Sequence, residues 1–176
     1  MKHWLFLALL VLVSPAYAQQ QAATVIVVRH AEKAAAPADN PPLTAEGAVR
    51  ADELARLLRD AGVTAIYSTP YTRTLDTARP LAHALGLPIT ETPILNRNVA
   101  AYGDSVAARV RREGGVIVVV GHSNTLGVVI KALGGPDIGE VTDPEYDHLF
   151  VVTVQDGKPA RLVRARYGRR FDVVSK

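Results

Sequence analysis

The sequence predicts an α/β fold: a three-layer α/β/α sandwich with a mainly parallel central sheet and a C-terminal antiparallel hairpin. Short β-branched runs such as "TVIVV" and "GVIVVV" are typical of strands buried on both faces. Amphipathic segments of helical period lie between these runs, and alternating strands and helices favour a parallel sheet. The last two strand-like segments are joined by Asp156-Gly157, which predicts a hairpin turn.

The first strand is expected at Thr24 to Val28, where the β-branched run is continuous. A Pro-rich loop, "APADNPP", separates it from a helix expected over residues 43–62. Thr44 is the expected N-cap of this helix, Glu46 suits its first turn, and Gly62 is expected to end it. A second strand follows at residues 63–68.

The middle of the chain predicts another helix and a short strand. The helix is expected over residues 69–86 and to end at Gly86, with a kink or a break at Pro80. A third strand is expected over residues 88–92, and after a polar loop a helix runs from near Asp104 to Glu113.

The last third of the chain completes the sheet. A strand is expected over residues 115–120, and a helix from Ser123 to Gly135 follows it directly. The terminal hairpin is expected over residues 147–167.

Residues 1–18 have the pattern of a secretory signal peptide. Lys2 precedes the ten-residue apolar run "WLFLALLVLV", and "AYA" places small residues at a cleavage point after Ala18. The alternative is an uncleaved anchor, although the run is short for a bilayer span. We therefore expect residues 19–23 to form a linker and residues 24–176 to form one domain. The mature protein is expected to be periplasmic or secreted, with no stable membrane insertion.

Composition and charge exclude several classes of protein. The chain is 48% hydrophobic and 21% charged, so it can bury a core, and it has no cysteine for a disulfide, a thiolate metal site or a thiol nucleophile. Removal of Lys2 with the leader lowers the formal net charge from +3 to +2. Such a charge argues against nucleic acid as a partner. The basic cluster at residues 161–170 is interpreted as the solvated face of an edge strand.

Polar residues follow three of the predicted strands. Arg29 and His30 end "VVRHAEK", Arg73 ends "STPYTR", and His122 lies in "GHSN". Ligands of open α/β sheets bind outside the carboxyl ends of the strands, so these four side chains are expected to converge there. Such a cationic group suits phosphate, because guanidinium groups match its oxygens, and the helix opening near Ser123 adds backbone N–H donors.

The same stretches resemble the signatures of a known family. "VVRHAEK", "TPYTRTLDTA" and "VVGHSNT" are similar, in this order, to the three motifs of the histidine phosphatase superfamily, which includes the phosphoglycerate mutases. The resemblance spans nearly the whole mature chain. It implies that His30 is a nucleophile that forms a phosphohistidine, that Arg29 and Arg73 clamp the phosphoryl oxygens, and that His122 stabilises the transferring charge. It also implies that neither a metal nor another cofactor is needed.

The remaining polar residues of these motifs leave alternatives open. Ser123 is expected either to donate to phosphate or to cap its helix, and Lys33 either to touch substrate or to face solvent. Thr77 is expected to pack or to form a hydrogen bond within its helix. His83 and His148 are interpreted as structural.

The proton donor for the leaving group is the part of the family pattern that this sequence lacks. "GHSN" has no acid after its histidine, so the candidate acids or supporting residues are Glu32, Glu91 and Asp104. A further candidate is the acidic loop of residues 136–148, which either folds over the pocket or is a solvated surface loop.

The expected activity is that of an exported phosphohydrolase acting on small phosphomonoesters or phosphorylated envelope sugars. The main alternative is a non-catalytic protein that binds phosphate on the same fold. A serine hydrolase centred on Ser123 fits less well, because Thr125 stands where the nucleophile elbow requires glycine. A metal site is also disfavoured, since the histidines do not lie at ligand spacing.

Overall fold

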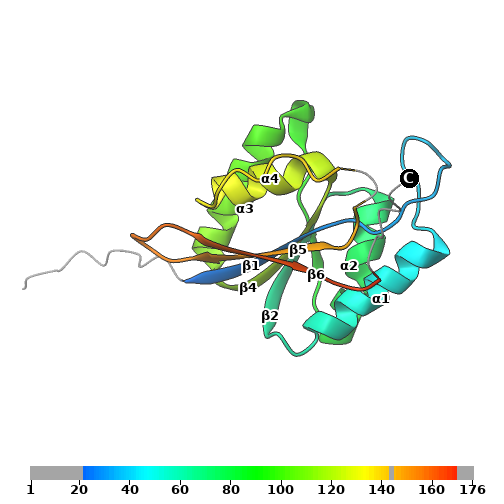
Figure 1. Ribbon diagram of the computed structural model, residues 1–176, viewed down its shortest axis with the longest axis horizontal. Helices are drawn as coiled ribbons and strands as arrows, with labels where there is room; N and C mark the ends of the chain where they lie inside the picture. Colours follow the sequence, from blue (N-terminus) through cyan, green and yellow to red (C-terminus); the bar gives the residue numbers. More distant parts are fainter. Residues whose placement is uncertain (1–21, 143–144, 170–176) are drawn as a thin grey trace, which may run out of the picture.

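The strand order places the first β-branched run inside the sheet. The computed structural model describes residues 22–142 and 145–169, and its six strands form one mixed sheet in the order β3-β2-β4-β1-β5-β6 (Figure 1). The strands are β1 (Ala23–Arg29), β2 (Val63–Ser68), β3 (Ile89–Glu91), β4 (Gly115–Gly121), β5 (His148–Val154) and β6 (Arg161–Arg166). The predicted α/β fold is confirmed.

The parallel part of the sheet aligns three strand ends. β4 lies parallel to both β1 and β2, and Val120 of β4 is in register with Val28 and Ser68. β3 is parallel to β2, whereas β5 pairs antiparallel with β1 and β6 antiparallel with β5. The carboxyl ends of β1, β2 and β4 therefore lie at one edge of the sheet, where the sequence places the polar motifs.

Helices cover the sheet on both faces. The helices are α1 (Ala45–Leu58), α2 (Thr72–Leu85), α3 (Val99–Glu113) and α4 (Ser123–Ala132), with a short 3-10 turn η1 (Leu95–Arg97) before α3. One buried cluster joins α1 and α2 to Val28 and Ile66, and the other joins α3 and α4 to Val27 and Ile117. Within the part of the chain that the structure describes, no helix combines the length and hydrophobicity that crossing a bilayer demands.

The helix termini agree only in part with the sequence signals. Thr44 caps α1 as predicted, since its side chain accepts a hydrogen bond from the Gly47 N–H at 3.0 Å. The helix ends at Leu58, and Gly62 lies in the turn beyond it with a φ of 69°, a left-handed conformation that suits glycine. α4 likewise ends at Ala132, before the predicted Gly135.

The predicted start of the third helix at Asp104 is wrong. α3 begins at Val99, capped by the Asn98 side chain, which accepts from the Ala101 N–H at 3.0 Å. Asp104 therefore lies inside the helix and is exposed. α4 packs closely against α3 at Gly103. A Cβ on this residue would lie 2.7 Å from the Val128 side chain, so the contact favours glycine.

The break predicted at Pro80 is also absent. α2 continues through this proline from Thr72 to Leu85. Thr77 and Ala78 before it and Leu81 and Ala82 after it are all buried, so packing on both sides of the proline keeps the helix continuous.

The C-terminal hairpin forms the far edge of the sheet, as predicted. β6 is the edge strand, and the side chains of Arg161, Arg164 and Arg166 are exposed along it. This agrees with the interpretation of the basic cluster over the residues described. The signal peptide predicted for residues 1–18 lies outside the described residues.

Candidate active site

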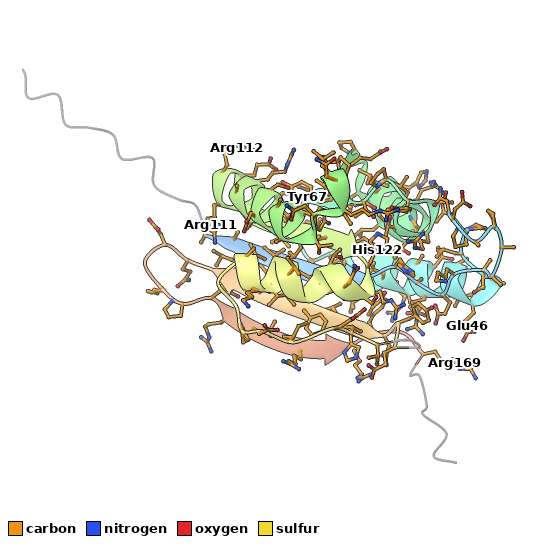
Figure 2. The ribbon with its side chains drawn as sticks, turned by 90° about the horizontal axis from the view of Figure 1, so that it is seen from above. Glu46, Tyr67, Arg111, Arg112, His122 and Arg169 are labelled. Carbon is orange, nitrogen blue, oxygen red and sulfur yellow. The ribbon has the colours of Figure 1, made fainter. Side chains whose placement is uncertain are left out.

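The three aligned strand ends bring the motif residues together. Arg29 is the last residue of β1, and the backbone N–H of His30 then donates to the Gly121 carbonyl at 2.9 Å, which ties the β1 and β4 ends. His122 follows β4 as the N-cap of α4 (Figure 2). Arg73 is the second residue of α2. Each side chain therefore owes its position to a strand end or to the helix turn that follows one.

The two histidine rings lie in edge contact in a small buried region. Their ring centroids are 5.5 Å apart at an interplanar angle of 65°, and only 2% of His30 and 7% of His122 is exposed. Arg29 is equally buried, and Arg73 is half-buried and close enough to repel it. Two guanidinium groups and two imidazoles in one such volume form an anion site.

Backbone geometry selects the tautomer of His30. Its Nδ1 lies 2.8 Å from the Ala31 carbonyl oxygen, which can only accept, so Nδ1 carries the hydrogen. Burial lowers the His30 pKa to about 4, assisted by the charges of Arg29 and Arg73 and opposed by the bond to Ala31. At neutral pH the ring is therefore uncharged, and Nε2 holds a free lone pair, which is the form that a nucleophile requires.

His122 is held by side chains instead. Its Nε2 lies 2.8 Å from Thr69 Oγ1, and its Nδ1 lies 3.3 Å from Arg73 Nη2. Burial lowers the His122 pKa to about 3, and Arg73, His30 and Arg29 lower it further. This ring is also neutral in the empty pocket.

A tyrosine accompanies each arginine. The Arg29 guanidinium lies over the Tyr146 ring at 4.4 Å, and the Arg73 guanidinium lies over the Tyr71 ring at 4.6 Å. Tyr146 also lies 5.9 Å from the His30 ring, and Tyr71 lies 5.1 Å from the His122 ring. Aromatic rings thus border the pocket on two sides.

The loop of residues 136–148 reaches this pocket. Arg29 Nη1 donates to the Thr142 and Glu145 carbonyls at 3.3 and 3.4 Å, next to Tyr146. Two of the carboxylates in this loop have partners elsewhere: Glu145 bonds His148 and Arg166, and Asp147 bonds Arg166. Over the described residues, the parts of the loop that contact Arg29 and His30 are the Tyr146 ring and the carbonyls of Thr142 and Glu145.

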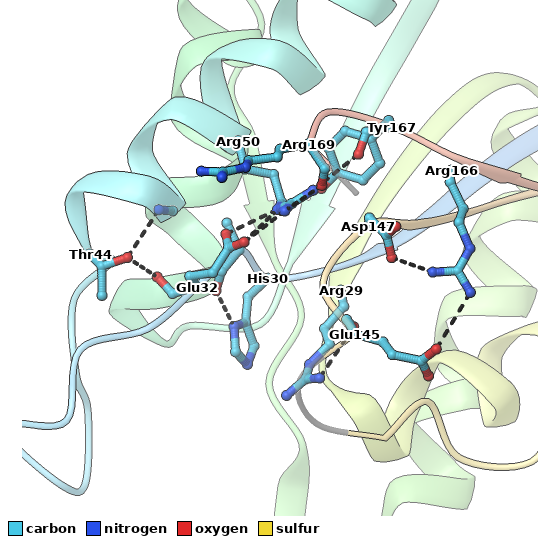
Figure 3. A network of polar contacts seen from close by, with 12 residues as sticks. Arg29, His30, Glu32, Thr44, Arg50, Glu145, Asp147, Arg166, Tyr167 and Arg169 are labelled. Carbon is cyan, nitrogen blue, oxygen red and sulfur yellow. Dashed lines mark hydrogen bonds and ion pairs between the residues drawn. The ribbon is translucent and has the colours of Figure 1, made fainter. Parts of the chain in front are cut away.

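Glu32 lies just outside the pocket. Its carboxylate forms an ion pair of 2.7 Å with the buried Arg50, whose guanidinium also donates to the Tyr167 and Arg169 carbonyls at 3.0 Å (Figure 3). The Glu32 backbone carbonyl accepts from the Thr44 N–H at 2.9 Å. Glu32 therefore fixes the loop after His30 against α1 and the C-terminal strand.

The other candidate residues take different places. Glu91 ends β3 and is exposed, and Asp104 is exposed within α3. Ser123 is the first residue of α4, beside His122, and is half-buried. Neither the His30 ring nor the His122 ring is hydrogen-bonded to a carboxylate within residues 22–142 and 145–169.

Thr77 links two of the motifs, as well as bonding within its helix as predicted. Its Oγ1 donates to the Arg73 carbonyl at 2.7 Å and accepts from the Ala31 N–H at 2.9 Å. This hydroxyl joins the loop that carries His30 to the helix that carries Arg73.

Sequence reasoning missed Thr69, Tyr71 and Tyr146 as pocket residues. Thr69 and Tyr71 stand within "STPYTR", so their proximity to Arg73 was the available signal. Tyr146 lies far along the chain from Arg29, and no local pattern marks that contact.

A hollow of about 700 Å³ between α1 and α2 is lined by residues such as Leu43, Ala55 and Pro80, and contains none of the four motif side chains. In the described ranges, no group of three or more histidine, aspartate or glutamate side chains is arranged to hold a metal ion.

Comparison with known proteins places this site in a family. A sequence model described as the histidine phosphatase superfamily, branch 1, matches residues 25–97, which include Arg29, His30 and Arg73. Over these residues the chain is similar to branch 1 of the histidine phosphatase superfamily. Members of this superfamily are metal-independent phosphatases and mutases. A comparison with curated proteins gave no match.

Solved structures of the superfamily share the fold. A putative phosphohistidine phosphatase SixA from Agrobacterium tumefaciens is 26% identical with a TM-score of 0.62, over 83% of this chain and 99% of that one. The protein histidine phosphatase SixA solved with tungstate is 19% identical with a TM-score of 0.66, over 81% and 96%. A phosphoglycerate mutase from Bacillus anthracis is 15% identical with a TM-score of 0.65, over 84% and 94%.

Proposed function

We propose that this protein is an exported phosphohydrolase that cleaves phosphomonoesters through a phosphohistidine on His30. The observation that carries the proposal is the neutral His30 ring, whose Nε2 lone pair lies in a buried volume shared with Arg29, Arg73 and His122. An anion bound there presents its phosphorus to His30 Nε2, the nitrogen of that ring that carries no hydrogen.

The reaction follows from these groups in two displacements. His30 Nε2 attacks phosphorus, the P–O bond to the leaving group breaks, and the leaving oxygen takes a proton from solvent water. Water then attacks the phosphohistidine, the P–N bond breaks, and inorganic phosphate leaves. Arg29, Arg73 and His122 stabilise the charge on the equatorial oxygens in both steps, which is the main requirement of phosphoryl transfer.

The substrate class is proposed as small phosphomonoesters, among them phosphorylated envelope sugars. The proposal of export rests on the signal-peptide pattern of residues 1–18. An exported protein would share a compartment with phosphorylated envelope sugars. A mature protein whose N-terminal sequence begins at Gln19 would support export.

A non-catalytic phosphate-binding protein is the second candidate. The observation in its favour is that neither pocket histidine bonds a carboxylate in the described residues, so a donor for the leaving oxygen is not evident there. It would keep the arginine clamp and bind phosphate without cleaving esters.

Trapping the covalent intermediate separates the two candidates. Purified mature protein is mixed with p-nitrophenyl phosphate, quenched in alkali, digested and analysed by mass spectrometry. We expect alkali-stable, acid-labile phosphate on His30, together with steady release of nitrophenol. Absence of both across pH 4 to 9, in protein that still binds phosphate, would establish the non-catalytic alternative.

A further inference from the structure

A chain of hydroxyl groups fixes the hydrogen on the second pocket histidine. Thr69 Oγ1 lies 2.8 Å from His122 Nε2 and 2.9 Å from Thr74 Oγ1, and Thr74 Oγ1 donates to the Thr69 and Tyr71 carbonyls at 2.8 Å. Because the carbonyls only accept, the Thr74 hydrogen points to them, and Thr69 donates to Thr74. Thr69 therefore accepts from His122, and the hydrogen on that ring is at Nε2.

Arg73 requires the same tautomer. Its Nη2 lies 3.3 Å from His122 Nδ1, and a guanidinium has hydrogens but no acceptor. Nδ1 must therefore hold a lone pair. The two independent contacts, on opposite sides of the ring, agree on one neutral form.

This form is unsuited to an anion. Arg73 is the phosphate clamp of the proposed function, so an oxyanion bound to its guanidinium comes next to His122 Nδ1. Two lone pairs would then face each other, one on the nitrogen and one on the oxygen. Protonation of Nδ1 removes the repulsion and adds a charge-assisted hydrogen bond.

We propose that His122 takes up a proton at Nδ1 together with the bound oxyanion, and that Thr69 and Thr74 are positioning residues that direct this proton to Nδ1. The Nδ1 lone pair forms the new N–H bond, and the Nε2–H bond to Thr69 stays in place. The proposal rests on the proposed function only in taking this volume as the phosphoryl site.

The surroundings explain why the proton arrives only with the anion. His122 faces Arg73 and Tyr71 from the α2 end, Arg29 and His30 from the β1 end, and the positive N-terminus of its own helix α4. Burial, and then the charges of Arg73, His30 and Arg29, lower the His122 pKa, and a bound dianion offsets these charges. A phosphomonoester below its second pKa of about 6 brings the proton itself.

The tautomer can be observed directly. Two-bond ¹H–¹⁵N spectra of the histidine rings at pH 7.5, without anion, are expected to show His122 as the Nε2–H form and His30 as the Nδ1–H form. An Nδ1–H form at His122 would overturn the proposal.

Proton uptake is the second measurement, with sulfate as the probe because it does not titrate near neutral pH. Sulfate binding at pH 7.0 is followed by calorimetry in buffers of different ionisation enthalpy, using the His30→Asn variant so that His122 is the pocket histidine that remains. We expect close to one proton taken up per sulfate, and close to none in the His30→Asn, His122→Asn double variant.

Thr69 variants test the positioning role. Thr69→Val keeps the side-chain shape without the hydroxyl, so uptake should fall below half a proton per sulfate, whereas Thr69→Ser should restore it. Proton uptake that is unchanged in Thr69→Val would remove Thr69 from the proposal.

Sulfate binding with no proton uptake in the His30→Asn protein would reject the proton coupling and leave the phosphatase function intact. Proton-coupled binding without a phosphohistidine would reject the phosphatase function and leave the proton coupling intact.

Discussion

The two histidines of the pocket are held in different ways. The His30 ring is fixed by a main-chain carbonyl, that of Ala31, and its free nitrogen is Nε2. The His122 ring is fixed by Arg73 and by the Thr69 hydroxyl, which Thr74 holds in turn, and its nitrogen without a hydrogen is Nδ1. A main-chain partner survives most substitutions, whereas the partners of His122 are side chains that a single mutation removes. The proposed nucleophile, His30, is thus the more securely oriented histidine, and His122, proposed to stabilise charge, is the more adjustable.

Replacing each histidine tests that difference most strongly. His30→Ala removes the group that forms the intermediate, so kcat with p-nitrophenyl phosphate should fall by about 10⁴-fold or more. His122→Ala removes one source of charge stabilisation and should lower kcat by about 10²–10³-fold while phosphate still binds. The exposed His83, on α2, is the matched control, and His83→Ala should leave kcat unchanged. Equal losses from the two pocket variants would contradict the separate roles.

The tyrosines beside the arginines give a smaller and more informative contrast. Tyr146 lies over Arg29 on the His30 side, and Tyr71 over Arg73 on the His122 side. Tyr146→Leu and Tyr71→Leu remove cation–π contacts worth about 1–2 kcal/mol, so each should reduce kcat/KM by roughly tenfold. A Phe at either position keeps the ring and should retain most of the activity. If Phe and Leu are equally impaired, the hydroxyl, rather than the ring, is what the pocket uses.

The pH dependence of the free energy of unfolding should reflect the two buried neutral rings of His30 and His122. Burial lowers the pKa of His30 to about 4 and that of His122 to about 3, against 6.5 for the exposed ring. The unfolded chain therefore binds more protons than the folded one as pH falls below 6.5, and the free energy of unfolding should decrease toward pH 4. For His30 alone the loss approaches about 3 kcal/mol.

Urea unfolding between pH 7 and pH 4 measures that decrease. His30→Gln and His122→Gln should each flatten the pH dependence, and His83→Gln should not. A wild-type stability that stays level over this range would show that the rings are not buried in their neutral form.

Sequence reasoning reached the strands, the order of the motifs and the four residues that meet at the sheet edge, because these depend on local patterns and one topological rule. It placed the start of α3 wrongly, because it passed over Asn98, a local capping signal, and because the close α3–α4 contact at Gly103 is a tertiary feature. It expected a kink or a break at Pro80, and the helix does not break there because residues on both sides of the proline are buried. Tyr146 was missed because its meeting with Arg29 depends on the path of a long loop.

The contacts of Arg50 bear on how this chain can be shortened or fused. From α1, Arg50 binds the carboxylate of Glu32, two residues after His30. It also donates to the main-chain carbonyls of Tyr167 and Arg169, which lie beyond β6. A version truncated after β5 would keep the residues of all three motifs. It would lose the Tyr167 and Arg169 carbonyls, to which Arg50 donates. We therefore expect the smallest active fragment to extend through Arg169, with a fused partner joined beyond that residue and separated from it by a linker.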